Sequence, residues 1–259
     1  MEQQVTVGFF TDPTLCIGCK ACEVACKEHN ALPHDGFVFT AMSYDNTGAL
    51  GASSYRHVKF VEETALAPDA PPGFLFLSDV CKHCERAGCL EACPTGAIVR
   101  TEVGGVFVQD DICNGCGYCV VSCPFGVIDR RQGPVPGAGG AHKCTFCYDR
   151  QKDGLVPACA KTCPTESIQF GPLSELRERA EARRQTLLDR GIAGVSVYDP
   201  SSVGGIHALF LTVGDGARFG LPSSPEVPTT HLRAAWSSAL LTSLFAIVAS
   251  ALAFWGAGP

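Results

Sequence analysis

The sequence predicts an α+β protein that ends in one transmembrane helix. Two observations carry this prediction: the 16 cysteines fall into four groups between Cys16 and Cys163, and no charged side chain follows Arg233. With 259 residues, of which 46% are hydrophobic and 18% charged, the chain has room for one or two folded domains and does not have the composition of a disordered protein. The net charge of −6 argues against nucleic-acid binding, which needs a basic surface.

The cysteine content favours metal ligation over disulfides. Disulfide-rich proteins are typically short secreted chains. This sequence begins with MEQQVTVGFF, which has neither the basic n-region nor the apolar h-region of a secretory signal. We therefore expect synthesis in a reducing compartment, where thiols are available to bind metals.

The spacing of the cysteines predicts the kind of metal group. The four groups are Cys16, Cys19, Cys22 and Cys26; Cys81, Cys84, Cys89 and Cys93; Cys113, Cys116, Cys119 and Cys123; and Cys144, Cys147, Cys159 and Cys163. The first and third have the C-x2-C-x2-C-x3-C spacing of bacterial ferredoxins, in which three thiolates hold one 4Fe–4S cluster and the fourth ligates the neighbouring cluster. Since each cluster takes four thiolates, the sequence predicts four 4Fe–4S clusters in two ferredoxin-like modules.

Other interpretations of the cysteines stay open at this point. Zinc sites use separated cysteine pairs, so zinc fits best at the fourth group, where 11 residues separate Cys147 from Cys159. Cations and histidines flank the groups: Lys20, Lys27, Lys82, His83, His142, Lys143 and Lys161. The lysines would either raise cluster potentials or be ordinary solvated side chains, and the histidines are expected as neighbours of ligands or as surface groups.

The remaining segments predict regular structure around the cysteine groups. We expect strands at residues 37–40, 55–61 and 206–213, and loops at residues 68–73 and 133–140. Residues 174–190 predict a helix with Ser174 as its cap and Gly191 at its end. Its apolar face consists of Leu173, Leu176, Ala180 and Leu187.

The C-terminal stretch predicts a membrane anchor. Trp236 and Trp255 lie nineteen residues apart. A helix places them about 28 Å apart, which matches the two interfaces of a bilayer. No nucleophile-and-base, phosphate-binding or dinucleotide motif is found, so we expect no catalytic residue and an electron carrier rather than an enzyme acting alone.

The cysteine pattern resembles the four-cluster subunits of molybdenum or tungsten pterin oxidoreductases. It is most similar to the membrane-anchored iron–sulfur (beta) subunit of respiratory formate dehydrogenases. The segments that carry the resemblance are residues 14–22, 43–46 (Ser-Tyr-Asp-Asn) and 198–207 (Tyr-Asp-Pro-Ser-Ser-Val-Gly-Gly-Ile-His), together with the anchor. The sequence departs from the family pattern where Lys27, rather than proline, follows Cys26, and where the tail stops just after the helix.

The resemblance implies which cysteines share a cluster. Set A would be Cys16, Cys19, Cys22 and Cys163, and set B would be Cys26, Cys144, Cys147 and Cys159. Set C would be Cys81, Cys84, Cys89 and Cys123, and set D would be Cys93, Cys113, Cys116 and Cys119. Residues 1–30 and 141–171 would then form one module and residues 79–140 the other. Residues 31–78 would be an inserted β-rich region, residues 172–230 a helix, strand and linker, and residues 231–259 the anchor.

The resemblance also implies the role of the protein. It would pass electrons from a pterin-containing catalytic subunit to a membrane cytochrome b-type or related quinone-reducing subunit. Molybdenum or tungsten, haem b and quinone would belong to those partners only. The soluble part would face the extracytoplasmic side, whereas Arg218 and Arg233 before the helix would place it in the cytoplasm by the positive-inside rule. Two alternatives remain: the same relay in a polysulfide, sulfoxide or nitrate reductase-like complex, and a zinc-binding structural protein.

Overall fold

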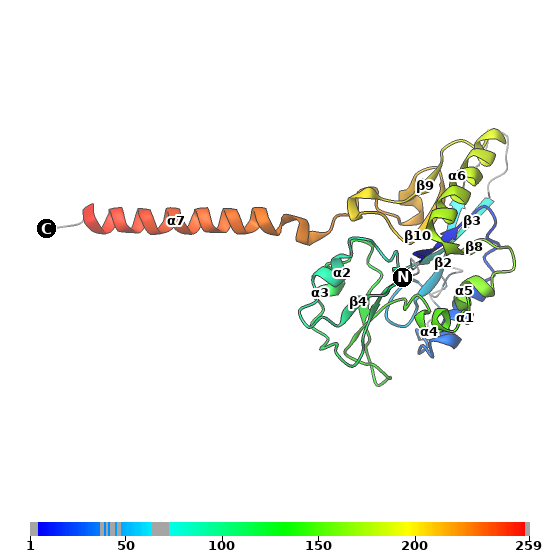
Figure 1. Ribbon diagram of the computed structural model, residues 1–259, viewed down its shortest axis with the longest axis horizontal. Coiled ribbons are helices and arrows are strands. Elements are labelled where there is room, and N and C mark those ends of the chain that lie inside the picture. The colour runs from blue at the N-terminus through cyan, green and yellow to red at the C-terminus, as the bar shows by residue number, and fades with distance from the viewer. Residues whose placement is uncertain are drawn as a thin grey trace.

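The computed structural model describes residues 5–36, 39, 41, 45, 48–63 and 73–256. A rounded α/β body carries all the cysteines, and one long helix, α7, extends away from it (Figure 1). In these described residues, the body contains one four-stranded sheet, three two-stranded hairpins and several short helices.

The central sheet has the strand order β8-β1-β10-β9. These strands are β1 (Val7–Thr11), β8 (Ile168–Pro172), β9 (Val195–Tyr198) and β10 (Ala208–Val213). β1 and β10 pair in parallel, with Phe9 opposite Ala208, and the outer strands are antiparallel to them. All six residues of β10 are buried, as expected for an inner strand that is covered on both faces.

Helix α6 (Leu173–Asp189) packs on this sheet through Leu173, Leu176, Ala180 and Leu187. These four residues are the predicted apolar face, and all are buried, so that prediction is confirmed. The predicted Ser174 cap is wrong: Pro172 is the residue before the helix, and no side chain caps it. Gly191 follows the helix with φ of 82°, as its predicted end requires.

Three hairpins extend from the cysteine-bearing segments. They are β2 (Arg56–Glu63) with β3 (Gly73–Val80), β4 (Ile98–Arg100) with β5 (Val106–Val108), and β6 (Asp129–Arg130) with β7 (Ala141–His142). The strands predicted at 55–61 and 206–213 correspond to β2 and β10, with ends shifted by one or two residues. The strand predicted at 37–40 lies outside the described residues except for Phe39, and of the loop predicted at 68–73 only Gly73, the first residue of β3, is described.

Short helices pair beside the cysteines. α1 (Ala21–His29) packs against α5 (Ala158–Lys161), and α2 (Gly88–Glu91) packs against α3 (Tyr118–Val121). α4 (Tyr148–Lys152) follows Cys147. A helix of four residues is unstable alone, so these helices depend on their packing. The first and last cysteine groups, far apart in sequence, are therefore neighbours in space.

The C-terminal region leads from the body to the anchor. Three 3-10 turns, η1 (Ser201–Val203), η2 (Gly216–Phe219) and η3 (Pro228–His231), precede α7 (Leu232–Gly256). The helical stretch Pro228–Trp255 is long and apolar enough to cross a membrane, and none of its most apolar part is buried within the protein. η3 contacts α2, so the α2–α3 pair lies beside the base of the anchor (Figure 1).

Candidate metal centres

The structure brings the cysteines together in four sets of four. Sets A, C and D each line a cavity, with about 290, 350 and 290 Å³ of space free of protein atoms, open solvent included. Each cavity is thus lined by three cysteines from one sequence group and one from another. In set B, Cys26 lies within electrostatic range of Cys144, Cys147 and Cys159.

The four sets lie in a row. Electrostatic contacts between cysteines of different sets join Cys22 to Cys159, Cys144 to Cys81, and Cys89 to Cys119. These contacts connect A to B, B to C and C to D. All four cysteines of set B are buried, whereas sets A and D each contain one exposed cysteine, Cys19 and Cys116. The row is therefore shielded in its interior and accessible at its two ends.

The backbone turns in the same way inside every cysteine group. The second residue after the first cysteine has a positive φ in all four: Gly18 (68°), His83 (45°), Gly115 (71°) and Phe146 (64°). Such a turn brings successive N–H groups to one side and forms a concavity for an anion, as in many iron–sulfur sites. His83 and Phe146 adopt this conformation at an energetic cost that glycine avoids, which indicates a functional requirement.

Several donors point at cysteine sulfurs. The backbone N–H of Phe146 donates to Cys144 Sγ at 3.4 Å, and that of Ala141 donates to Cys113 Sγ at 3.4 Å. Lys143 Nζ donates to Cys81 Sγ, also at 3.4 Å. Donors of this kind favour the thiolate form that binds metals.

Burial is the largest effect that opposes ionisation of the thiols, and neighbouring cysteines add to it. Together they raise the pKa of Cys22 and of Cys89 to about 12, and the pKa of Cys119 and of Cys147 to about 11. Without a metal these thiols would keep their protons at neutral pH. A metal group that replaces the protons therefore suits the sites, because metal binding and thiol deprotonation are coupled.

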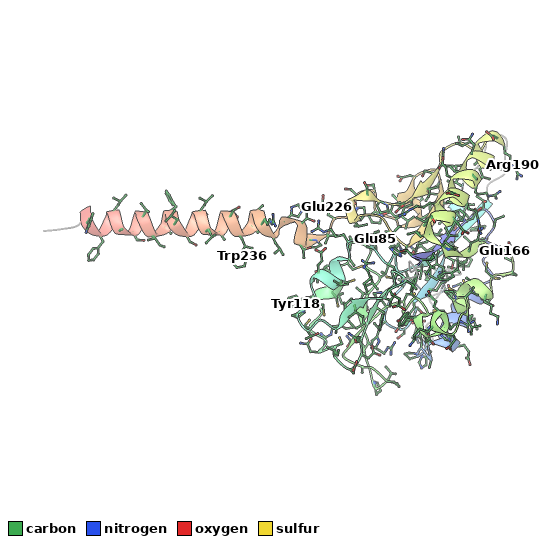
Figure 2. The ribbon with its side chains drawn as sticks, viewed as in Figure 1. Glu85, Tyr118, Glu166, Arg190, Glu226 and Trp236 are labelled. Atoms are coloured by element: carbon green, nitrogen blue, oxygen red, sulfur yellow. The ribbon has the colours of Figure 1, made fainter. Side chains whose placement is uncertain are left out.

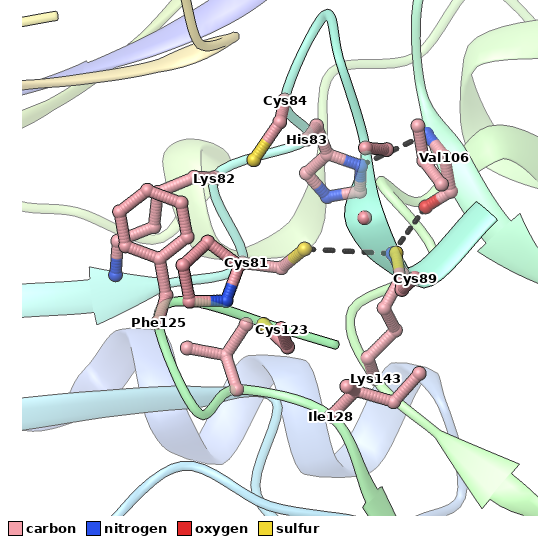
Figure 3. Close-up of a pocket in the computed structure, with 14 residues that line it drawn as sticks. Cys81, Lys82, His83, Cys84, Cys89, Val106, Cys123, Phe125, Ile128 and Lys143 are labelled. Carbon is pink, nitrogen blue, oxygen red and sulfur yellow. Dashed lines mark hydrogen bonds between the residues drawn. The ribbon is translucent and has the colours of Figure 1, made fainter. Parts of the chain in front are cut away.

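Within the described residues, three buried donor atoms beside the cysteines have no hydrogen-bond partner: Nε and Nη2 of Arg56, and Nε2 of His83. His83 lines the cavity of set C, where its Nδ1 accepts the Val106 N–H at 3.0 Å (Figure 3). Burial and the nearby Lys143 hold the pKa of His83 well below its usual value, so the neutral ring carries its proton on Nε2. Unpaired buried donors are costly, and sulfide atoms of a 4Fe–4S cluster would accept from them. The sites therefore fit such a cluster.

The flanking cations divide into two kinds. Lys82 and Lys143 are buried, which excludes the solvated-lysine interpretation for these two. Lys20 lies 2.7 Å from Asp45 and Lys27 lies 2.6 Å from Asp35, while Lys161 is exposed.

Of the flanking histidines, both His83 and His142 are buried. His142 Nε2 donates to the Gly137 carbonyl at 2.8 Å. It therefore supports the loop at residues 133–140 rather than lying at the surface.

Sequence reasoning missed Arg56, which is also fully buried. The sequence feature that could have pointed to Arg56 is a charged residue at the start of an apolar strand in a protein with many cysteines.

The segment at residues 198–207 supports set C. The N–H of Glu85, directly after Cys84, donates to the Gly205 carbonyl at 3.0 Å. His207 Nε2 lies 2.6 Å from the Glu85 carboxylate, and His207 directly precedes β10. This segment therefore ties the loop after Cys84 to the central sheet.

Comparisons with known proteins agree with this chemistry. The model of the family described as 4Fe-4S dicluster domain matches residues 73–173. The iron–sulfur subunit of the nitrate-inducible formate dehydrogenase of Escherichia coli is 38% identical over 245 residues, which covers 92% of this chain and 79% of the relative. The formate dehydrogenase-O iron–sulfur subunit of E. coli is 40% identical, with 88% and 74% covered. The B subunit of the anaerobic dimethyl sulfoxide reductase of E. coli is 35% identical, with 66% and 76% covered.

The fold, the cysteine sets and these matches define an electron-transfer protein of the 4Fe–4S class. Such a protein is not catalytic by itself and works within an oxidoreductase complex. More specifically, this protein belongs to the family of formate dehydrogenase iron–sulfur subunits. The formate dehydrogenase relatives are named as iron–sulfur subunits, which leaves the zinc interpretation without support.

A buried ion pair positions the segment that begins set C. Asp79 contacts the buried Lys82 and lies 2.8 Å from Lys59. Although burial raises the pKa of Asp79, the two lysines hold it below its usual value. Removal of one partner from a buried pair leaves an uncompensated charge.

We expect Asp79→Asn to destabilise the protein by about 3–5 kcal/mol, because Lys82 loses its counter-charge. The temperature at which half of the visible cluster absorbance is lost should fall by about 10 °C. Glu181→Gln, which breaks the exposed pair with Arg184 on α6, is the control and should leave that temperature unchanged. An equal effect of both variants would show that the buried pair has no special role.

Proposed function

We propose that the protein passes electrons through four 4Fe–4S clusters, held by sets A, B, C and D in that order, between a pterin-containing formate dehydrogenase subunit and a quinone-reducing membrane subunit. The observation that carries the proposal is the continuous row of four cysteine sets, buried inside and exposed at both ends. When bound, each cluster accepts and releases one electron.

The protein residues supply the environment of the relay. Set B is enclosed, so water is kept from the middle of the row, and the backbone turns at Gly18, His83, Gly115 and Phe146 provide N–H groups toward negative charge. A fixed scaffold also limits rearrangement of the site when its charge changes, which favours rapid transfer.

The pairing of short helices supports the proposed division into modules. Helices α1 and α5 pack together, as do α2 and α3. A separate small core, which includes Ala87, Ile98, Val106, Ile128 and Ala141, surrounds the second pair. We therefore assign residues 1–30 and 141–171 to one ferredoxin-like module and residues 79–140 to the other.

The two exposed ends are suited to different partners. Ile17 and Val24 are exposed beside set A, and Val121 is exposed beside set D. Tyr118, also exposed, lies at the set D end (Figure 2). Exposed apolar clusters typically indicate protein interfaces. Because α2 contacts the turn before α7, the set D end lies nearest the anchor. We assign set D to the membrane subunit and set A to the catalytic subunit.

A second candidate is the same relay in a dimethyl sulfoxide reductase-like complex. The relative of that kind shares 35% identity, and the match covers 66% of this protein. The formate dehydrogenase relatives share 38–40% over 88–92%. The longer match therefore favours formate as the substrate of the catalytic partner.

The decisive experiment is low-temperature EPR on the complex, isolated anaerobically in detergent with its catalytic subunit. We expect formate to produce signals of reduced 4Fe–4S clusters, because electrons from formate oxidation enter the relay. Full reduction by dithionite with no response to formate would retain the relay and exclude formate as its electron source.

The proposed cluster assignment is tested at its two ends. Cys163→Ala should remove the set A cluster and about four iron atoms per protein, because one of its four thiolates is lost. Cys116→Ala should remove a different cluster, that of set D, with a similar loss of iron. Iron analysis and EPR measure both changes. Loss of the same signal in both variants, or unchanged iron content, would contradict the assignment.

We propose that the body of the protein lies on the extracytoplasmic face of the membrane. A protease site inserted in the exposed loop at residues 133–140 should be cut in spheroplasts and protected in inside-out vesicles, because protease reaches only the outer surface of each. The same protein solubilised in detergent, where both faces are accessible, is the control. Cleavage only in inside-out vesicles would place the domain in the cytoplasm.

A further inference from the structure

Two fully buried cations lie between neighbouring cysteine sets. The first is Arg56, at the start of β2. Its Nη1 donates to the Ser78 carbonyl at 3.2 Å and to Ser78 Oγ at 3.1 Å, and Ser78 Oγ lies 3.2 Å from Cys22 Sγ of set A. Its guanidinium carbon lies 4.9 Å from the centre of the Phe9 ring.

The other side of Arg56 faces set B. Its electrostatic neighbours include Cys159, Cys144 and Cys26 of that set. Its Nε and Nη2 atoms are buried and have no hydrogen-bond partner in the part of the chain that the structure describes. A guanidinium remains charged in proteins and presents donors in a fixed plane. Arg56 is thus a permanent positive charge, with two free donors, between sets A and B.

The second cation is Lys143, at the boundary of sets B and C. Its Nζ donates to Cys81 Sγ of set C at 3.4 Å (Figure 3). It also donates to the carbonyl of Cys144 of set B at 3.1 Å. It also donates to the Val106 carbonyl. The two anchoring carbonyls hold the ammonium group in place, so its charge cannot move away to solvent.

Set B is therefore flanked by a cation on each side. Among the described residues, Arg56 is the cation that set A shares with a neighbouring set, and Lys143 is the one that set C shares. The buried Lys82 also lies near Cys123 of set C, but the buried carboxylate of Asp79 is its counter-charge. Within the described part of the sequence, no hydrogen bond joins a lysine or arginine to a cysteine of set D. The row thus has an uneven distribution of fixed positive charge.

We propose that Arg56 and Lys143 set the order of reduction potentials along the relay, with set B as the site that holds an electron most strongly. The inference rests on the proposed function, since it requires clusters in sets A to D. Both residues act through the sets that they flank and are positioning residues rather than catalytic ones.

The physical reason is electrostatic. An oxidised cluster with four thiolates has a charge of about −2, and one added electron makes it about −3. That electron comes from the adjacent cluster, which is oxidised by one electron, so no atom or proton moves. A nearby cation stabilises the more negative state, and it does so strongly in a buried site where water does not screen it.

The test is an EPR-monitored redox titration of the detergent-solubilised complex and of two charge-removing variants, Arg56→Gln and Lys143→Gln. We expect Arg56→Gln to lower the reduction equilibrium constants of the clusters in sets A and B at least tenfold. This corresponds to a fall of about 59 mV in the reduction potential of each cluster. Lys143→Gln should lower those of sets B and C by a similar factor. Set B should respond to both substitutions and set D to neither.

The controls separate charge from structure. Arg56→Lys and Lys143→Arg keep the charge and should restore most of each shift, whereas Lys161→Gln removes an exposed lysine near sets A and B and should shift nothing. In the unmodified complex, the signal altered by Cys26→Ser should be the first to appear on reduction. This measurement tests the inference even if a glutamine variant fails to assemble.

Two results would overturn the inference. One is a uniform shift of all four signals, and the other is a set B signal that appears last on reduction. Neither result would affect the proposed function, which fails if the unmodified complex lacks the four clusters or if formate does not reduce them.

Discussion

The concentration of 16 thiols between Cys16 and Cys163 is the constraint on which the rest of this structure depends. Buried thiolates are unfavourable unless positive charge, N–H donors or metal ions compensate them. The protein uses each of these means: left-handed turns that gather N–H groups, backbone donors to Cys144 and Cys113, and cations fixed by carbonyl groups. The iron ions of the 4Fe–4S clusters supply the remaining positive charge that buried thiolates require.

The same constraint explains why the helices near the cysteines are so short. Helices α2, α3 and α5 have four residues each, which is too few to be stable in isolation. Each places a cysteine in a set and then ends, so that the next cysteine can reach another set. Rigidity comes instead from the central sheet, from α6 and from the segment that ends at His207. The central sheet therefore supports the fold, and the cysteine sets bind the clusters.

The arrangement of burial follows from electron transfer between proteins. A carrier must exclude water from the middle of its path and still approach partners closely at its ends. Set B is fully buried, whereas Cys19 and Cys116 reach the surface beside exposed apolar side chains. The anchor fixes the orientation of the row, because α2 contacts the turn that leads into α7. In the proposed function, this helix therefore determines which end of the relay meets the membrane.

Sequence alone determined the chemistry of this protein: the cysteine spacing predicted 4Fe–4S ligation, the uncharged tail predicted the terminal apolar helix, and the helical periodicity predicted the buried face of α6. These features are local, since each depends on residues a few positions apart. The Ser174 cap was a wrong local prediction, because the tertiary packing of Leu173 starts the helix one residue earlier. Only the tertiary structure decided that Arg56 and Lys143 lie between cysteine sets, and that the four sets form a row with exposed ends. The reason is that such contacts join segments far apart in the sequence, as in the pairing of Phe9 with Ala208, and spacing along the sequence does not encode them.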